Sequence, residues 1–204
     1  QGVVFGSTKE AKLRLTLSGA DSAGEGKLIA PGVVAYPSNN GAANVVQTLQ
    51  DDRGIRLLNV IDNADAPTEY TYGIKVPGGT RIELQPDGGA VILNKKGEFY
   101  ALVPKPWAKD ASGQAVNTYF TTDGTILTQV VEHKAGGVAY PVVADPYIQW
   151  RWYGMNVFTN RNETNNLMLG VTIGSAVAWK LPQPYGAILT SVGAIYAGYA
   201  NWAY

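Results

Sequence analysis

Cysteine is absent from this 204-residue chain, and histidine occurs once, at His133. Without cysteine the chain has no disulfide, no thiolate metal site and no cysteine nucleophile. A single histidine supplies neither a histidine-based metal cluster nor a catalytic triad with a histidine to spare. We therefore predict no metal site, no cofactor and no enzymatic activity, and we interpret His133, which follows an expected strand, as structural.

Charge is also scarce. Sixteen basic and sixteen acidic residues give a net charge of zero, and no basic run is longer than Lys95-Lys96. This balance argues against nucleic acid as a partner. Charged residues make up 16% of the chain, against roughly 25% in an ordinary soluble domain. A surface with so little charge favours association over mutual repulsion.

Short apolar stretches separated by turn residues predict an all-β, sandwich-like module over residues 1–146, beginning with N-terminal strands in 1–50. The residues from Lys9 to Leu17 alternate between apolar and polar. They predict a half-buried strand near a sheet edge or paired across subunits, because charged side chains guard such edges. Leu28 to Tyr36 is a second apolar stretch, interrupted by Pro31-Gly32. Six regularly spaced stretches follow, as is typical of a sandwich or barrel: Tyr70–Val76, Thr80–Leu84, Ala90–Leu93, Glu98–Val103, Thr118–Thr122 and Ile126–Val131.

Asp51-Asp52-Arg53-Gly54 separates the apolar stretches Val45–Leu49 and Ile55–Ile61. This pattern predicts a hairpin with Gly54 at a positive φ and the paired aspartates as turn formers. Four other aspartates that stand beside or within two residues of Gly, Pro or Ser have the same interpretation, namely Asp87, Asp110, Asp123 and Asp145. No glycosidase-like pair of carboxylates is predicted among them.

The longest connection of this part, from Pro104 to Val116, contains Trp107 directly after Pro104 and Pro106. A tryptophan in this position either closes one end of a sandwich or forms a platform for a ligand. Trp150 and Trp152 belong to an aromatic segment over 147–160, which we interpret as a linker, and they share the second interpretation.

Pro141 and Pro146 bound a stretch that we predict to be one short strand from Tyr140 to Asp145, because each proline removes a backbone donor. The stretch resembles the end of the β module in a family of secreted, largely uncharacterised actinobacterial proteins, where a YPVVADP-like strand precedes tails of differing character. The resemblance rests on residues within 51–146, the family-like core: Ile55–Ile61, Ala66–Tyr70, Pro86–Gly89, Pro106–Asp110, Gln129–His133 and Tyr140–Pro146. It implies secretion and a Gram-positive source, and it implies no activity and no catalytic residues.

The chain changes character after the linker. Asn160 as N-cap and Glu163 at the third helical position predict a helix start, and Asn160–Thr164 also resembles one of the family's tails. Leu181-Pro182-Gln183-Pro184 ends that helix, and a second one is expected to run to about Tyr204. Lys180 is the only charge between Leu167 and Tyr204. The fold class is therefore α+β: a mostly β protein whose helical C-terminus, an apolar hairpin over 161–204, is typical of a segment buried in a core, a partner or a membrane.

Ten residues of this hairpin are predicted to contact other copies of the protein or a membrane, and Gly170 and Gly174 among them permit close helix packing. They are Leu167, Gly170, Val171, Gly174, Ala178, Trp179, Ile188, Val192, Ile195 and Trp202.

Three functions are consistent with these features. The first is a secreted, non-enzymatic protein that self-associates into a homo-oligomer or fibre outside the cell or at its surface. The second is a membrane-active, bacteriocin-like toxin that inserts the 161–204 hairpin, although each helix offers about 15–20 residues against the ~20 that a bilayer core requires. The third is a ligand- or glycan-binding β-sandwich. The start at Gln1 without an initiator methionine favours a cleaved signal peptide over a cloning product, so an extracellular or cell-surface location is expected.

Overall fold

The computed structural model describes residues 2–5, 13–17, 24–37, 40–49 and 54–150. These residues form β-strands joined by turns and contain no helix. The strands are β1 (Gly2–Phe5), β2 (Leu13–Leu17), β3 (Lys27–Ala30), β4 (Val33–Pro37), β5 (Ala42–Leu49), β6 (Gly54–Ile61), β7 (Glu69–Lys75), β8 (Thr80–Leu84), β9 (Ala90–Asn94), β10 (Phe99–Val103), β11 (Trp107–Lys109), β12 (Thr118–Thr122), β13 (Ile126–Val131), β14 (Val142–Asp145) and β15 (Tyr147–Trp150). The mostly β prediction is confirmed for this part of the chain, and the helical hairpin expected over 161–204 lies outside the described residues.

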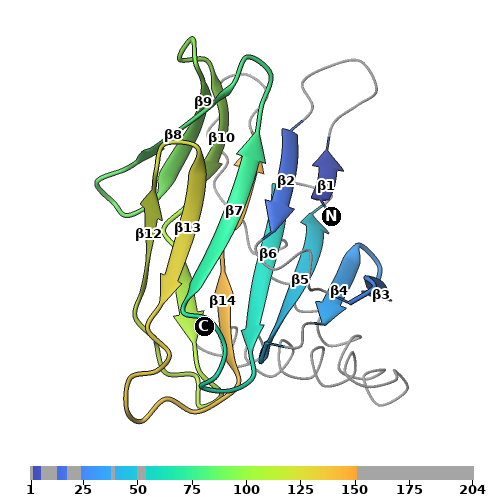
Figure 1. Ribbon diagram of the computed structural model, residues 1–204, viewed down its shortest axis with the longest axis vertical. Coiled ribbons are helices and arrows are strands. Elements are labelled where there is room, and N and C mark those ends of the chain that lie inside the picture. Colours follow the sequence, from blue (N-terminus) through green and yellow to red (C-terminus); the bar gives the residue numbers. More distant parts are fainter. Residues whose placement is uncertain (1, 6–12, 18–23, 38–39, 50–53, 151–204) are drawn as a thin grey trace, which may run out of the picture.

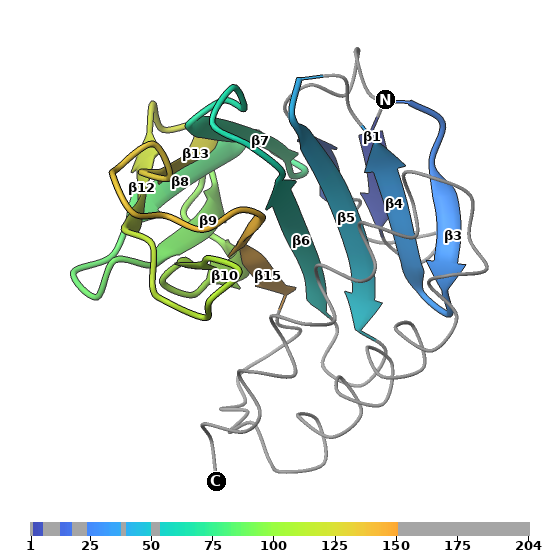
Figure 2. The ribbon, with the colours of Figure 1, turned by 90° about the horizontal axis from the view of Figure 1, so that it is seen from below.

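The strands form two sheets, in which every pairing is antiparallel. The smaller sheet has the order β1-β2-β7-β13-β12. The larger sheet has the order β3-β4-β5-β6-β15-β10-β9-β8, and β14 pairs with both β6 and β11 beside this path. Figure 1 shows β2 and β7 in front of β5 and β6, and Figure 2 shows β8, β9 and β10 turning towards β12 and β13. The two sheets therefore lie face to face.

One hydrophobic core fills the space between the sheets. Tyr72 and Ile74 enter it from β7, and Ile55 and Leu57 enter it from β6. On β7 these buried side chains alternate with exposed ones, as expected for a strand with one face in water. Burial of each such apolar side chain contributes roughly 1.5–3 kcal/mol, so the core is the main source of stability of this part of the chain.

The spacing between 70 and 131 predicts the observed strands β7, β8, β9, β10, β12 and β13 to within one residue at either end. The stretch from Leu28 to Tyr36 forms the hairpin β3–β4, with Pro31-Gly32 at its turn and Gly32 at a φ of 72°. Alternation also predicts β2 correctly where the structure describes it, since Leu15 is buried and Arg14 is exposed. However, β2 is the second strand of its sheet, because β1, which the sequence did not predict, lies outside it.

Three predicted features differ from the structure. The connection between Pro104 and Val116 contains β11, and the strand expected from Tyr140 starts at Val142, as β14. The β structure also does not end at Pro146. Tyr147–Trp150 is a strand between β6 and β10, so the linker expected over 147–160 begins inside the larger sheet.

Gly54 is a fourth difference. It does not have the positive φ that a hairpin turn would require; it is the first residue of β6. A Cβ atom at this position would lie 2.4 Å from the ring of Tyr147 on the neighbouring strand. The glycine is therefore needed for the close approach of an aromatic ring and not for a turn.

Candidate functional site

The larger sheet carries a second apolar surface on the side that faces away from the shared core. On β6 the core residues Ile55, Leu57 and Ile61 alternate with Leu58 and Val60, which therefore point to the opposite side. We call this side the outer face and define it by two rows of paired residues: Ala35, Val45 and Leu58 across β4, β5 and β6, and Ala43, Val60 and Val143 across β5, β6 and β14. All six side chains are at most 2% exposed.

A buried ion pair lies on the same face. Arg56 Nε is 3.1 Å from Asp145 Oδ2, and the two side chains are 17% and 2% exposed. Trp107 pairs with Asp145 across β11 and β14, and its side chain donates a hydrogen bond to the carboxylate. Tyr147 pairs with Arg56 across β15 and β6, and the guanidinium carbon lies 5.5 Å from the centre of its ring. Two aromatic side chains thus flank an ion pair that is almost entirely removed from water.

Burial changes the protonation behaviour of Asp145 in this pair. It raises the pKa of Asp145 to about 6, while Arg56 and the Trp107 hydrogen bond act in the opposite direction. The second carboxylate oxygen, Oδ1, is buried and accepts no hydrogen bond. A carboxylate in this state costs stability. The arrangement holds four strands in register, and it presents no atom of Asp145 to a dissolved substrate.

A chain of polar side chains crosses the core between the two sheets. Asn59 of β6 donates to the hydroxyl of Tyr72 on β7, and that hydroxyl donates to Gln129 Oε1 at 3.4 Å. Gln129 in turn donates to Thr118 Oγ1 at 3.1 Å. Buried polar groups that satisfy one another in this way make one packing of the two layers preferable to others.

His133 joins two connections between strands. Its Nε2 lies 3.0 Å from the carbonyl oxygen of Pro67, and its Nδ1 lies 3.0 Å from the hydroxyl of Tyr140. Because a carbonyl can only accept, Nε2 carries a proton. Burial lowers the pKa of His133. Both ring nitrogens are engaged in packing the 62–68 and 132–141 connections together, which supports the structural interpretation of this residue.

Most of the aspartates occupy turns, as predicted. Asp110 Oδ1 accepts hydrogen bonds from the Ser112 and Gln114 backbone, both at 2.9 Å, and Asp110 Oδ2 accepts one from Ala139. Burial acts to raise the pKa of Asp110, but these hydrogen bonds and one from the Ser112 hydroxyl bring it below its ordinary value. Asp87 and Asp123 cap their own turns. Asp145 is the exception, since it lies within β14 and pairs with Arg56; the turn interpretation of this residue is wrong.

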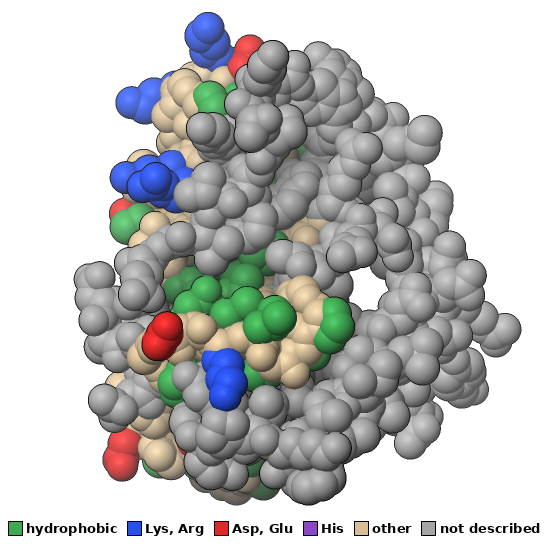
Figure 3. All heavy atoms as spheres, turned by 90° about the vertical axis from the view of Figure 1, so that its right-hand side faces the viewer, with side chains coloured by type: hydrophobic (Ala, Val, Ile, Leu, Met, Phe, Trp, Pro, Cys, Tyr) green, Lys and Arg blue, Asp and Glu red, His purple; other side chains and the backbone are tan. Residues whose placement is uncertain are grey.

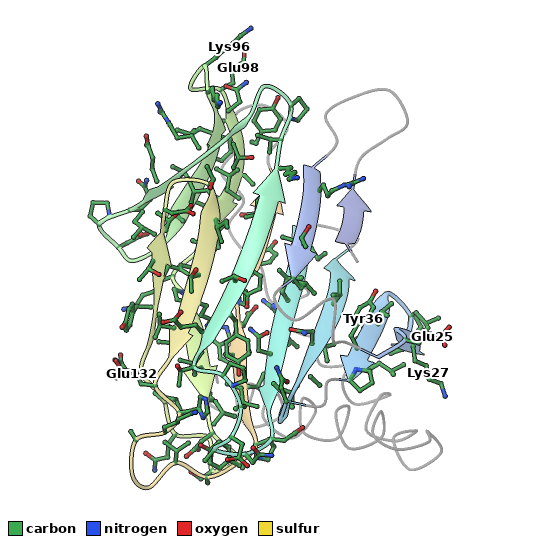
Figure 4. The ribbon with its side chains drawn as sticks, in the orientation of Figure 1. Glu25, Lys27, Tyr36, Lys96, Glu98 and Glu132 are labelled. Carbon is green, nitrogen blue, oxygen red and sulfur yellow. The ribbon has the colours of Figure 1, made fainter. Side chains whose placement is uncertain are left out.

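The hairpin β3–β4 forms an apolar projection at one end of the larger sheet, and β3 is the last strand on that side within the described part of the chain. Leu28 on β3 is 64% exposed. Val33, Val34 and Tyr36 on β4 are half-buried. Figure 3 shows hydrophobic side chains gathered on this side of the molecule, and Figure 4 shows Glu25, Lys27 and Tyr36 on the same hairpin.

The opposite end of the larger sheet is closed. The amide of Ile82 on β8 donates to the carbonyl of Gly124 at 2.8 Å, which ties this strand to the turn between β12 and β13. Turns between the neighbouring strands carry charges there, and Figure 4 shows Lys96 and Glu98 at the tip of the β9–β10 hairpin. One end of the larger sheet is therefore an exposed apolar hairpin, whereas the other is hydrogen-bonded to the smaller sheet and carries charged turns.

The structure places few of the predicted site residues. Trp107 lies on β11 against Asp145, where it supports the ion pair. Trp150 pairs through its backbone with Ala101 of β10. Trp152 and the ten hairpin residues between 167 and 202 lie outside the described residues, so their predicted contacts stay predictions.

Sequence reasoning missed Arg56 and Tyr147. The signal was present for Arg56, because it is a single charged residue within the apolar run from Ile55 to Ile61. Asp145 likewise ends the apolar run that starts at Val142. Two opposite charges, each inside a strand that is otherwise apolar, indicate a buried pair more strongly than a turn.

Within the described ranges no group of three or more His, Cys, Asp or Glu side chains is arranged to hold a metal ion. The same residues include no helix that is long and apolar enough to span a bilayer. Comparisons of the chain with protein-family models, curated proteins and solved structures give no match.

Proposed function

We propose that the protein is a secreted, non-enzymatic protein that associates with other copies of itself outside the cell or at its surface. The observation that carries the proposal is the exposed apolar hairpin β3–β4, at which the larger sheet ends among the described strands. A strand at the end of a sheet is a template for a strand from another chain, and an exposed leucine on it adds apolar area to the contact.

Charge supports the same function. The net charge is zero and only 16% of the residues are charged, so copies of the chain repel one another little. The apolar 161–204 segment, with its ten predicted contact residues, offers further surface for association. Secretion rests on the family resemblance of the 51–146 core.

The groups that would serve general acid–base chemistry have structural contacts in the described part of the chain. His133 bridges two connections, Asp110 organises a turn, and Asp145 is paired with Arg56 inside the sheet. Trp107 donates to Asp145 and so does not favour a glycan-binding platform. These contacts support a binding and assembly function over a catalytic one.

Replacement of Leu28 by Lys tests the proposal. Burial of a leucine side chain contributes roughly 1.5–3 kcal/mol, which corresponds to about ten- to hundredfold in a dissociation constant. We expect L28K to shift the monomer–oligomer equilibrium of the full chain by at least about tenfold towards the monomer. Sedimentation velocity over a range of protein concentrations measures this shift.

Leu84→Lys is the matched control. Leu84 is 45% exposed on β8, which forms the closed end of the same sheet, so its replacement is expected to leave association unchanged. A wild-type chain that is monomeric at every concentration would refute self-association. If that monomer released dye from liposomes, the toxin hypothesis would replace it.

A further inference from the structure

The outer face of the larger sheet is apolar and inaccessible to water, yet no described strand lies over it. Val45, Leu58, Val60 and Val143 are at most 2% exposed. None of them belongs to the core between the sheets. Figure 2 shows the smaller sheet on one side of β4, β5 and β6, and no described element on the other side. The described strands therefore leave the burial of this face unexplained.

Length and composition favour one segment of the chain as the cover of this face. Four of the remaining stretches are short, namely 6–12, 18–23, 38–39 and 50–53, whereas 151–204 is long. It contains four charged residues, Arg151, Arg161, Glu163 and Lys180, and is otherwise rich in Ala, Val, Leu, Ile, Trp and Tyr. Such a segment matches a wide apolar sheet face in both size and chemistry.

The described part of the chain also ends close to the outer face. β15 is the last described strand, and it pairs with β6 in the middle of the larger sheet. An extended connection over 151–160 reaches about 33 Å, whereas the strands from β15 to β4 span roughly 15 Å at their usual spacing. A segment tethered this closely has a high effective concentration at the face, which favours it over the same segment of another molecule.

We propose that the 161–204 segment docks on the outer face of its own chain, across β4, β5, β6 and β14. The larger sheet then has an apolar layer on each side. This inference can fail without the proposed function failing, because the β3–β4 hairpin is the observation that carries the proposed function. It changes the expectation for the ten predicted contact residues, since part of them bind the chain's own sheet and the remainder are left for other copies.

The absence of cysteine makes a thiol-protection experiment direct, because every introduced cysteine is the only thiol in the chain. Ala35→Cys and Ala43→Cys probe the outer face, Ala101→Cys probes the core between the sheets, and exposed Ala115→Cys is the reactive reference. Each is made in the full chain and again with Gly174→Glu and Ala178→Glu, which place two carboxylates on the apolar segment. The rate of maleimide labelling under native conditions is measured.

We expect the outer-face thiols to be protected in the full chain and to react at least tenfold faster when the two glutamates are present. The core thiol should stay protected in both backgrounds. Outer-face thiols that remain protected beside the glutamates overturn the proposal. Protection that is lost on dilution also overturns it, because a second copy is then the cover.

A second measurement decides the matter if the glutamates also expose the core thiol. A protease site introduced in the 151–160 connection is cut in the folded protein, and the product is analysed by gel filtration at low concentration. Co-elution of the 161–204 fragment with the β part supports docking on the outer face, and separation of the two refutes it.

Discussion

Tyr70 and Tyr72 lie two residues apart on the same face of β7, and both are buried, but their hydroxyl groups have different surroundings. The Tyr72 hydroxyl receives a hydrogen bond from Asn59 and donates to Gln129. The Tyr70 hydroxyl is buried without a hydrogen-bond partner, and burial raises the pKa of both phenols. A buried hydroxyl without a partner loses its hydration and gains nothing in return.

Substitution of each tyrosine by phenylalanine should therefore have opposite effects. Y70F removes an unsatisfied hydroxyl and is expected to stabilise the protein by up to about 1 kcal/mol. Y72F removes the hydrogen-bond partner of the Asn59 side-chain amide and of Gln129 Oε1, and should cost about 1–3 kcal/mol. Urea unfolding of the two variants measures the difference. Equal effects of the two changes would contradict the assigned hydrogen bonds.

The Arg56–Asp145 pair predicts a pH-dependent variant. Burial raises the pKa of Asp145 from 3.8 to about 6. Protonation of Asp145 therefore stabilises the folded protein fully below pH 3.8, and this stabilisation is lost as the pH rises through 6. Replacement of Arg56 by Met leaves the ionised carboxylate buried without its counter-charge. We expect R56M to cost about 3 kcal/mol or more at pH 8 and progressively less as the pH falls towards 6 and below, because protonated Asp145 needs no cation.

Two controls accompany R56M in the same unfolding experiments. Arg81→Met breaks the exposed Arg81–Glu83 pair, whose side chains are 48% and 47% exposed, and should cost less than about 1 kcal/mol at every pH. The double variant R56M/D145N removes both charges and should lose the pH dependence. A cost of R56M that does not change with pH would show that Asp145 is not the group that responds.

At the scale of elements, β15 is a central strand that lies between β6 and β10. Ile148 of β15 is fully buried and pairs with Ile55 of β6, and Gln149 pairs with Leu102 of β10. The four residues after Pro146 therefore connect two halves of the larger sheet. Without them, β10 would lose the neighbour that joins it to β6.

Two truncated chains test the importance of this strand. A chain that ends at Trp150 keeps β15 and should show a β-type circular dichroism spectrum and cooperative thermal unfolding, at a lower temperature than the full chain because its outer face is uncovered. A chain that ends at Pro146 should lose cooperative unfolding, because burial of Ile148 and the ladder hydrogen bonds of β15 are both removed. Identical melting curves for the two chains would show that the larger sheet does not depend on β15.

For the whole molecule, the main asymmetry is between the faces of its two sheets. The smaller sheet has one buried face and one exposed face, as β7 shows with exposed Thr71 and Lys75. The larger sheet is buried on both sides around β6, where seven of eight residues are buried. An element with two buried faces lies at the centre of a protein and needs layers on both sides.

Local patterns in the sequence were sufficient for the strands from 70 to 131. Alternation with period two and glycine-rich turns depend on neighbouring residues alone, so Thr80–Leu84, Thr118–Thr122 and Ile126–Val131 were predicted with their observed bounds. The same patterns could not place β1 and β15, because a short strand is stabilised mainly by the neighbours it pairs with. For β15 those neighbours are distant in sequence, because β6 precedes it by most of the module, whereas β1 has only four residues and pairs with β2 alone among the described strands.

The amino-acid sequence by itself determined where most strands begin and end and which aspartates make turns, because these are properties of a few consecutive residues. The tertiary structure decided which face of each strand is buried and which charges meet. Asp145 looks like a turn residue beside Pro146, and Arg56 looks like an isolated charge in an apolar run. Only the pairing of β6 with β14 and β15 brings them to 3.1 Å, and removal of water around that pair then raises the pKa of Asp145.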